Sequence, residues 1–547
     1  MVRRGLPSGL LLSLVFLTVL PLLAHLLFSR LGFNPTDDGF TLAYARRLLE
    51  GQVPHRDFII IRPALSPLIH VPFVLWGGAH TYLASRLFVW FQFAAISWVW
   101  VHIILRQTGV AAGWNEKLCL GLVAFVASAH SFPMMAWHTV DALFLFSLGM
   151  ALCVREATAG KSLGYFLLGA ACLCKQSFLF APVAAIALLG DWRRPRLWWT
   201  IAAPAVLYAA WLALTGAFRD GSLQLTARTD ILSAGVASYL NPIFALGVVV
   251  GFAATWLLAP GPGRGGGADG RPRELLGILL IWGLPVFGLA LTLALGRFIL
   301  VASFGLFGLV VACTTALILR EGAPAGGRAR SGLLVLACAW CVSLSLGYNN
   351  PALAGGQLLT VLVTQAYPSM ERRWHGGGVR LPLAAAAAVL AAAFCVTRVD
   401  HTYQEPPARY LTRRLDKLLD GGAGLLSNEN TYAFLADLRV AETRALALGR
   451  TYAIIPDCAG VWVHSKQRNP LCIDWAFGTE LSRERLFRRL TQQLEAMRDT
   501  NIVIVEKVEP FALKYGLLPP REVAPVVRFV REHLSRVGET RLFELYR

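Results

Sequence analysis

Apolar runs long enough to cross a lipid bilayer recur along this chain from Leu10 to Val396 and then stop. A spanning helix needs about 20 mostly apolar residues, because backbone polar groups inside lipid must find their partners within a helix or a closed barrel. Over the 547 residues, 56% are hydrophobic and only 15% are charged, whereas about a quarter of an ordinary soluble domain is charged. The pattern predicts a polytopic α-helical membrane protein.

Basic residues in the short loops predict how the runs are oriented, because Lys and Arg are enriched on the cytoplasmic side. Arg3 and Arg4 precede the first run, which we expect to be retained as a helix rather than cleaved as a signal peptide. The rule gives about thirteen crossings, with the N-terminus inside and the chain after residue 398 outside. The predicted crossings are 10–28, 83–105, 118–136, 139–154, two short helices within 163–190, 197–214, 241–258, 275–294, 298–319, 333–345, 352–366 and 381–396.

The net charge of +18 is a signal of topology here. The arginines cluster in short loops between apolar runs, where they also suit anionic lipid head groups. No basic stretch carries the interleaved aromatics of a nucleic-acid groove, so nucleic acid is not an expected partner. The ten cysteines lack zinc-site spacing and are expected to be mostly buried thiols. Cys458 and Cys472 could instead form a disulfide in an oxidising compartment.

The predicted topology divides the chain into a membrane module, residues 1–398, and a soluble α/β domain, residues 399–547. In the second part charges become dense, "RTYAIIPD" and "TNIVIVEKV" are typical of buried strands, and 482–499 and 524–537 of amphipathic helices. Within the module, residues 29–82 form one long external loop. Its apolar segment 64–78 is short for a crossing and contains two prolines, so we expect it to lie at the membrane surface.

The external loop begins with an unusual cluster of charged residues, in "NPTDDGFTLAYARRLLEG". The pattern predicts a helix over 39–51 that lies flat on the membrane, with its apolar face down and Arg46, Arg47 and Glu50 on the other face. Asp37 and Asp38 stand at its N-terminus, where a carboxylate caps the helix. A cap needs only one aspartate. The aspartate that is not needed as a cap is a candidate general base for an acceptor hydroxyl, or a ligand for a divalent metal beside a phosphate.

Two basic residues are candidates for binding a lipid phosphate. Arg62 in "IIIRPALSPL" lies just before the surface segment, and its guanidinium suits a phosphate, although an interfacial arginine can also simply snorkel. Lys175 lies inside the run 163–190. Because basic residues flank both ends of that run, both ends should be cytoplasmic, and the run must bend near Lys175 at the outer surface. A lysine at membrane depth is otherwise costly, by at least about 2.5 kcal/mol.

The order of these motifs resembles that of a known enzyme class. After the first helix come "DDGFTLAYARRLLEG", "HRDF", "IRPALSPL", a helix with Arg86 near its outer end, and "LLGAACLCKQSFLFAPVAA". The order is similar to that of the GT-C class of polyprenyl-phosphate-sugar-dependent glycosyltransferases, in the bacterial branch with the lipid A aminoarabinose transferases and the relatives of protein O-mannosyltransferases. The resemblance follows motif order through residue 190 and architecture beyond it.

The resemblance implies roles for individual residues. Asp37 and Asp38 match the family's acidic pair, of which the first acid is usually catalytic, and Arg62 and Lys175 would face the donor phosphate. Further candidates are Arg297 for the donor phosphate, His138 and Asp141 for acceptor contact or a helix cap, and Tyr348 and Asn349 as lining of the cavity.

The implied reaction transfers a sugar from a polyprenyl phosphate to a hydroxyl of a glycan, lipid or protein acceptor, with inversion, at the outer face of a bacterial cytoplasmic membrane. The sequence indicates no certain cofactor and leaves a divalent metal open. Two alternatives are a transporter or flippase of a lipid-linked glycan, and an enzyme like an O-antigen ligase or polymerase. Transporters often show symmetry between halves, and the second half of this chain has no equivalent of the acidic loop.

Overall fold

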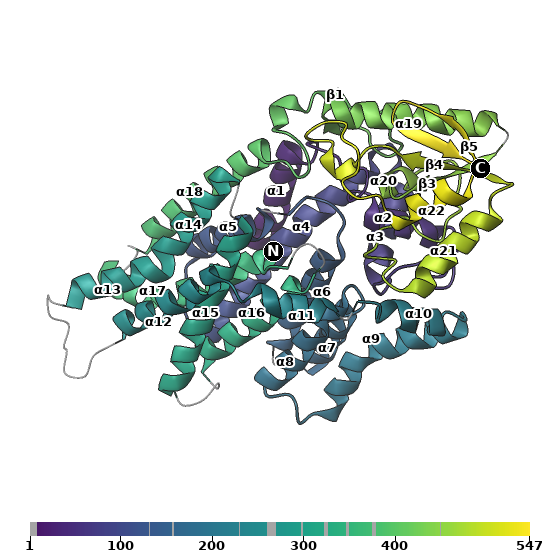
Figure 1. Cartoon of the computed structure of the whole chain (residues 1–547). Coiled ribbons are helices and arrows are strands. Elements are labelled where there is room, and N and C mark those ends of the chain that lie inside the picture. The colour runs from purple at the N-terminus through teal and green to yellow at the C-terminus, as the bar shows by residue number, and fades with distance from the viewer. Residues whose placement is uncertain are drawn as a thin grey trace, which may run out of the picture.

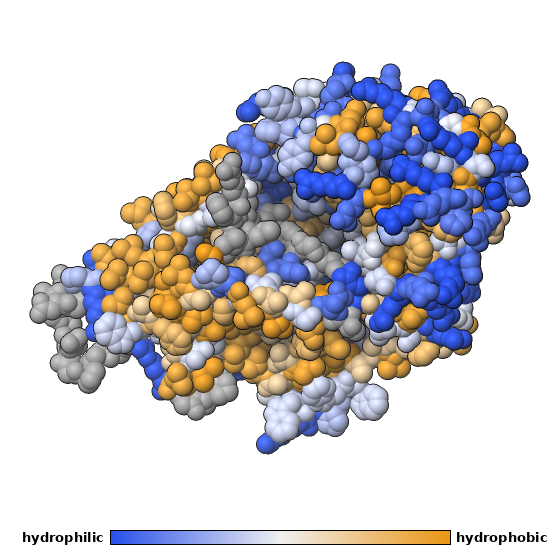
Figure 2. Space-filling model, viewed as in Figure 1, coloured by the Kyte–Doolittle hydropathy of each residue, from blue (hydrophilic) through white to orange (hydrophobic). Residues whose placement is uncertain are grey.

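The structure divides into a helical module and a smaller α/β domain. The computed structural model describes residues 8–130, 132–155, 158–228, 230–259, 270–296, 299–321, 326–345, 349–374, 379–448 and 450–547. The α/β domain sits against one end of the module formed by α1 to α18 (Figure 1). Hydrophobic side chains cover much of the module, whereas hydrophilic ones dominate the α/β domain (Figure 2). The predicted fold class, a helical membrane protein with a C-terminal α/β domain, is confirmed.

Each predicted crossing overlaps one or more helices. In the part of the chain that the structure describes, six helices have the length and composition to cross a membrane, or seven if one bent pair is a single span. Others are shorter than a full span, so the count of about thirteen crossings stays a prediction. The helices of the module are α1 (Ser8–Phe28), α2 (Phe40–Leu49), α3 (Leu65–Trp76), α4 (Thr81–Thr108), α5 (Trp114–Ala129), α6 (His138–Cys153), α7 (Thr158–Ala171), η2 (Gln176–Leu179), α8 (Phe180–Leu188), α9 (Pro195–Leu214), α10 (Phe218–Leu225), α11 (Asp230–Ser238), α12 (Pro242–Leu258), α13 (Gly270–Ile278), η3 (Leu279–Gly283), α14 (Leu284–Leu295), α15 (Ile299–Glu321), α16 (Gly327–Ser343), α17 (Gly355–Trp374) and α18 (Arg380–Asp400).

The run 163–190 is broken, as its flanking charges predict. Helix α7 ends at Ala171, and η2 and α8 begin again at Gln176, with Lys175 between them. The ammonium of Lys175 is buried and donates a hydrogen bond of 3.2 Å to the backbone carbonyl of Val342, in the last turn of α16. Carbonyls in the last turn of a helix have no partner within the helix and carry its negative dipole end. A neighbouring helix therefore satisfies this lysine.

The α/β domain is built on a four-stranded mixed sheet. Its strands are β3 (Thr451–Ile455), β4 (Asn501–Glu506), β6 (Phe543–Tyr546) and β5 (Arg536–Glu539), in that order across the sheet. β3 and β4 are parallel, and the other pairs are antiparallel. Helices α19 (Glu429–Ala447), α21 (Glu484–Ala496) and α22 (Pro525–His533) accompany it. The two predicted strands are confirmed, but the helix predicted over 524–537 ends at His533, because 536–539 pairs with β6 instead.

Helix α2 does not lie open on the membrane surface. The predicted helix is present, but the α/β domain covers part of the face that was expected to meet water, and Arg47 is only 3% exposed. Its N-cap is Gly39, with no side-chain hydrogen bond, so neither aspartate caps it. The apolar segment that follows forms the short helix α3, which packs against α2, α4 and α6. The α/β domain thus packs against the loop 29–82.

The loop and the α/β domain approach each other most closely at two glycines. A Cβ atom added to Gly39 would lie 2.1 Å from the Cα atom of Gly460, so the two backbones would have to separate. We expect Gly39→Ala to lower the free energy of unfolding by about 1–3 kcal/mol, measured by thermal unfolding of the full chain. Gly288→Ala is the matched control, because no atom outside the local backbone of its own helix lies within 4 Å of the added Cβ atom. Equal unfolding temperatures for the two variants would contradict this close approach.

Candidate active site

Asp37 and Asp38 lie in a closed turn between α1 and α2. The side-chain oxygen of Asn34 accepts hydrogen bonds from the backbone N–H groups of Thr36 (3.0 Å) and Asp37 (2.9 Å). In return, the backbone N–H of Asn34 donates to a carboxylate oxygen of Asp38 at 2.8 Å. An asparagine that bonds its own backbone two residues ahead is typical of such turns. The turn thus bonds Asp38 through its carboxylate and Asp37 through its backbone N–H.

Asp38 forms a buried ion pair with Arg86 of α4. One terminal guanidinium nitrogen of Arg86 lies 2.6 Å from the carboxylate of Asp38 and also donates to the carbonyl of Gly32 at 2.8 Å. The other terminal nitrogen donates to the carbonyl of Ser29 at 2.6 Å, just beyond the end of α1. Both side chains are nearly inaccessible to water. Asp38 and Arg86 thus join the acidic turn to α1 and α4.

Asp37 has a tyrosine as its side-chain partner. The hydroxyl of Tyr403, which follows α18, donates a hydrogen bond of 2.6 Å to the carboxylate of Asp37. Burial raises the pKa of Asp37 to about 6; the bond from Tyr403 opposes this rise, and the neighbouring charge of Asp38 adds to it. A carboxylate whose pKa lies near the working pH can accept a proton during a reaction. Of the two acids, Asp38 is paired with an arginine and Asp37 with a neutral tyrosine.

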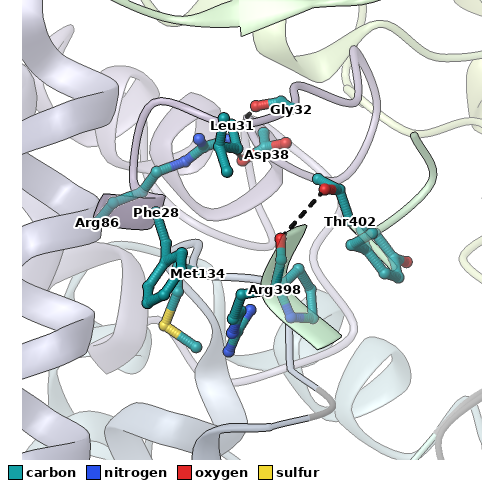
Figure 3. A pocket seen from close by; sticks show the side chains of 10 residues that line it. Phe28, Leu31, Gly32, Asp38, Arg86, Met134, Arg398 and Thr402 are labelled. Atoms are coloured by element: carbon teal, nitrogen blue, oxygen red, sulfur yellow. Dashed lines mark hydrogen bonds and ion pairs between the residues drawn. The ribbon is translucent and has the colours of Figure 1, made fainter. Parts of the chain in front are cut away.

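A hollow lies beside the acidic turn, where the module meets the α/β domain (Figure 3). It encloses about 440 Å³, part of which is open to solvent. Asp38 and Arg86 lie on one side, and Arg398 and Thr402, from the end of α18 onward, lie on another (Figure 3). Tyr403 also lines it, and apolar lining comes from Phe28, Leu31, Pro133 and Met134. Two guanidinium groups and an apolar wall, with one carboxylate, suit an anionic ligand with a lipid part.

Arg62, Lys175 and His138 form a second polar group, outside the lining of this hollow. A guanidinium nitrogen of Arg62 donates a hydrogen bond of 2.9 Å to Glu480 of the α/β domain. The central guanidinium carbon of Arg62 lies 5.3 Å from the centre of the Phe40 ring. His138, at the start of α6, is within electrostatic reach of both Arg62 and Lys175. The two described candidates for the donor phosphate, Arg62 and Lys175, thus both act electrostatically on His138.

The segment 132–138 links the hollow to this second group. Pro133 and Met134 line the hollow, while the ring of Trp137 lies 4.8 Å from that of His138 and 5.7 Å from that of Phe40. His138 itself is buried, and its Nδ1 atom has no hydrogen-bond partner among the described residues. An unpartnered buried nitrogen at this position is suited to a ligand.

The remaining candidates have varied surroundings. Asp141 is fully buried, and its carboxylate accepts hydrogen bonds from Ser66 (2.5 Å) and Gln92 (2.7 Å) and contacts His70 at 3.2 Å. These partners occupy it between α3, α4 and α6 and favour a structural role. The side-chain oxygen of Asn349 accepts a bond of 3.3 Å from the backbone of Ser345. Arg297 and Tyr348 lie outside the described residues.

Sequence reasoning missed the contribution of the segment after α18. Arg398, Thr402 and Tyr403 all line the hollow, and Glu405 accepts hydrogen bonds from the backbone of Phe33 (3.1 Å) and from the side chains of Ser427 and Asn428. Burial raises the pKa of Glu405 to about 7. The available signal was "TRVDHTYQEP", a cluster of polar side chains directly after the last apolar run.

The possible disulfide is absent, because Cys458 and Cys472 are both buried free thiols. Cys472 lies in the segment between β3 and α21, and its backbone carbonyl accepts a bond from Ile59 at 2.6 Å. The thiol of Cys458 instead lies 3.1 Å from a carboxylate oxygen of Glu506.

Comparisons with known proteins give weak structural similarity to solved structures. No protein-family model and no curated protein matches the chain. Crystal structures of ArnT from Cupriavidus metallidurans are similar with 12% identity, in the apo state (TM-score 0.45, 98% of this chain and 97% of that one) and bound to undecaprenyl phosphate (TM-score 0.46, 99% and 98%). The cryo-EM structure of arabinosyltransferase EmbB from Mycobacterium smegmatis has 17% identity and a TM-score of 0.34, over 73% of this chain and 42% of that one.

Proposed function

We propose that the chain is a membrane glycosyltransferase that moves a sugar from a polyprenyl-phosphate donor to an acceptor hydroxyl, with inversion, on the extracytoplasmic face. The observation that carries the proposal is Asp37: a buried carboxylate with a pKa of about 6, held by Tyr403, which lines the hollow together with Arg86 and Arg398. The resemblance of the motif order supports the same reaction. The N-terminus would lie in the cytoplasm, and the α/β domain would lie outside a bacterial cytoplasmic membrane.

In the proposed reaction Asp37 accepts the proton of the acceptor hydroxyl. The oxygen then attacks the anomeric carbon from the side opposite the phosphate, and the bond between that carbon and the phosphate oxygen breaks. The proton stays on Asp37 until solvent removes it, and the electron pair of the broken bond leaves with the lipid phosphate. No glycosyl-enzyme intermediate is needed, so one carboxylate suffices, and Asp38 keeps the turn in place through Arg86.

Cationic side chains would stabilise the departing phosphate, where negative charge increases during the reaction. Arg62 uses one N–H group for Glu480, and a guanidinium has five such groups. The ammonium of Lys175 uses one of its three N–H groups for the carbonyl of Val342. Both can therefore bind a phosphate without leaving their present partners. The acceptor would enter by the hollow at Asp38, Arg86 and Arg398.

The experiment that tests the proposal is glycosyl transfer by purified full-length protein in lipid vesicles. A panel of polyprenyl-phosphate sugars serves as donors, glycan and lipid hydroxyls serve as acceptors, and the anomeric configuration of the product is read by NMR. We expect transfer with inversion from at least one donor. Transfer from a soluble nucleotide sugar without lipid, or movement of a lipid-linked glycan between leaflets without transfer, would overturn the proposal.

The bond from Tyr403 gives a prediction for the pH profile. The bond lowers the pKa of Asp37, so in Tyr403→Phe that pKa rises above about 6 and less of the base is ionised near neutral pH. We expect the acidic limb of kcat/KM to move up by about half to one pH unit, which corresponds to a hydrogen bond of about 1 kcal/mol.

The control for this profile is Tyr410→Phe, which changes an exposed tyrosine of the same segment. Its acidic limb should coincide with that of the wild type. If the Tyr403→Phe limb also stays in place, Asp37 is not the base that the profile reports.

A further inference from the structure

A second buried cluster of carboxylates lies in the α/β domain. Asp457 and Cys458 follow strand β3, and Glu506 ends strand β4. The two strands are parallel neighbours, with Ile455 opposite Val505, so the residues that follow them meet at one edge of the sheet. One ligand atom from each of Asp457, Cys458 and Glu506 lies within 4.8 Å of the other two, and all three side chains are buried.

The cluster contains carboxylate oxygens that the protein leaves unsatisfied. The second oxygen of Asp457 and the second oxygen of Glu506 are both buried without a hydrogen-bond partner among the described residues. The charged groups that act on the three side chains are acidic: Asp37, Glu442 and Glu509. Burying carboxylates together is unfavourable unless they are protonated or neutralised by a cation. The arrangement therefore calls for a proton or a metal ion.

We propose that Asp457, Cys458 and Glu506 bind a divalent transition metal, with Zn²⁺ the best match. A thiolate with two carboxylates excludes Mg²⁺ and Ca²⁺ as preferred ions, because those take oxygen ligands, whereas Zn²⁺ accepts sulfur and oxygen together. Tetrahedral zinc holds its ligand atoms about 3.3–3.8 Å apart, and the thiol of Cys458 already lies 3.1 Å from a carboxylate oxygen of Glu506. A water would complete the site as the fourth ligand, and the buried hydroxyl of Thr36 lies beside Asp457.

A neighbouring hollow offers the ion a path from solvent, and the position of the site gives a bound ion a structural role. A second hollow of about 410 Å³, part of it open to solvent, is lined by Glu506 together with Pro456 and Glu509. Binding would release the thiol proton of Cys458 and any proton held by the carboxyl groups. Because Thr36 belongs to the turn that carries Asp37, a metal here would tie the sheet of the α/β domain to the proposed catalytic turn. The inference does not depend on the reaction proposed above.

The test is metal binding by the purified full-length protein in detergent. We expect about one equivalent of Zn²⁺ after loading and dialysis, and with Co²⁺ the near-ultraviolet band of a cobalt–thiolate bond. Cys458→Ser should abolish that band and weaken zinc binding at least about 100-fold. The serine can still donate a hydrogen bond to Glu506, so the variant keeps the native contact. Glu506→Gln should weaken binding similarly.

Cys472→Ser is the matched control, because it removes the other buried thiol of the same domain. It should keep both the cobalt band and the zinc affinity. Should Cys458→Ser fail to fold, a cobalt band that is present in the wild type and in Cys472→Ser but lost in Glu506→Gln still supports the site. No stoichiometric zinc in the wild type, or binding unchanged in Glu506→Gln, would overturn it and assign the cluster to carboxyl groups that share a proton.

Discussion

Replacing Asp37 by asparagine is expected to slow glycosyl transfer by about 10²- to 10⁴-fold, the usual contribution of a general base. Asparagine has the shape of aspartate and can still accept the hydrogen bond from Tyr403, but its amide cannot take a proton at neutral pH. The fold should therefore survive while the reaction fails. The measurement is the initial rate of transfer in vesicles, with thermal unfolding recorded on the same samples.

The matched control is Asp57→Asn, the same change in the same external loop. Asp57 pairs with Arg56 in a partly exposed ion pair at 2.8 Å, and exposed pairs contribute little. Its rate should stay within about twofold of the wild type. Full activity of Asp37→Asn would remove Asp37 from the reaction. Were Asp38→Asn, without loss of folded protein, to lose the rate instead, the base would be Asp38.

The sequence places the acidic pair but does not distinguish its members. Both aspartates precede the same helix, and either could have been its cap. What distinguishes them is a partner far along the chain. Asp38 pairs with Arg86, 48 residues away. Asp37 accepts a hydrogen bond from Tyr403, 366 residues away. A local pattern carries no information about such partners. The cap itself was predicted wrongly, because Asp38 bonds the backbone of Asn34 and not that of α2.

The break at Lys175 illustrates what local sequence can predict. Charges on both sides of one apolar run require the chain to reverse, and that inference uses only neighbouring residues. The structure has the reversal, and it adds the partner that the sequence does not supply, the carbonyl of Val342. Neither kind of reasoning finds the proposed metal site, since Asp457 and Glu506 are 49 positions apart in the sequence and meet only because β3 and β4 pair.

Arg46 and Arg47 show how burial reverses an expectation drawn from amphipathic pattern. Both were expected on the polar face of α2. Arg46 stays partly exposed and pairs with Glu50 one turn along the same helix. Arg47 is covered by the α/β domain, and its guanidinium makes two bonds to Asp474, of 2.6 and 2.8 Å, with further bonds to Gln52 and to the carbonyl of Leu471. Nothing in the helix pattern distinguishes the two arginines.

Arg47→Met should therefore lower the free energy of unfolding by about 3–5 kcal/mol, the usual effect of removing one member of a buried ion pair. Methionine fills part of the volume but leaves Asp474 charged and buried, with Asn469 as a remaining side-chain donor at 2.7 Å. Because the pair joins α2 to the α/β domain, the domain should loosen from the loop before the membrane module unfolds. Limited proteolysis at the junction after α18 and thermal unfolding measure both effects.

Arg46→Met is the neighbouring control and should change the free energy of unfolding by no more than about 0.5 kcal/mol, as for other exposed pairs one turn apart. A difference of several kcal/mol between adjacent arginines on one helix can arise only if the α/β domain is seated on Arg47. Equal effects of the two substitutions would mean that α2 lies open to water, as its sequence pattern suggests. Helix α2 begins three residues after Asp37. Loss of the contact between Arg47 and the α/β domain should therefore also reduce glycosyl transfer in Arg47→Met, whereas Arg46→Met should retain full transfer.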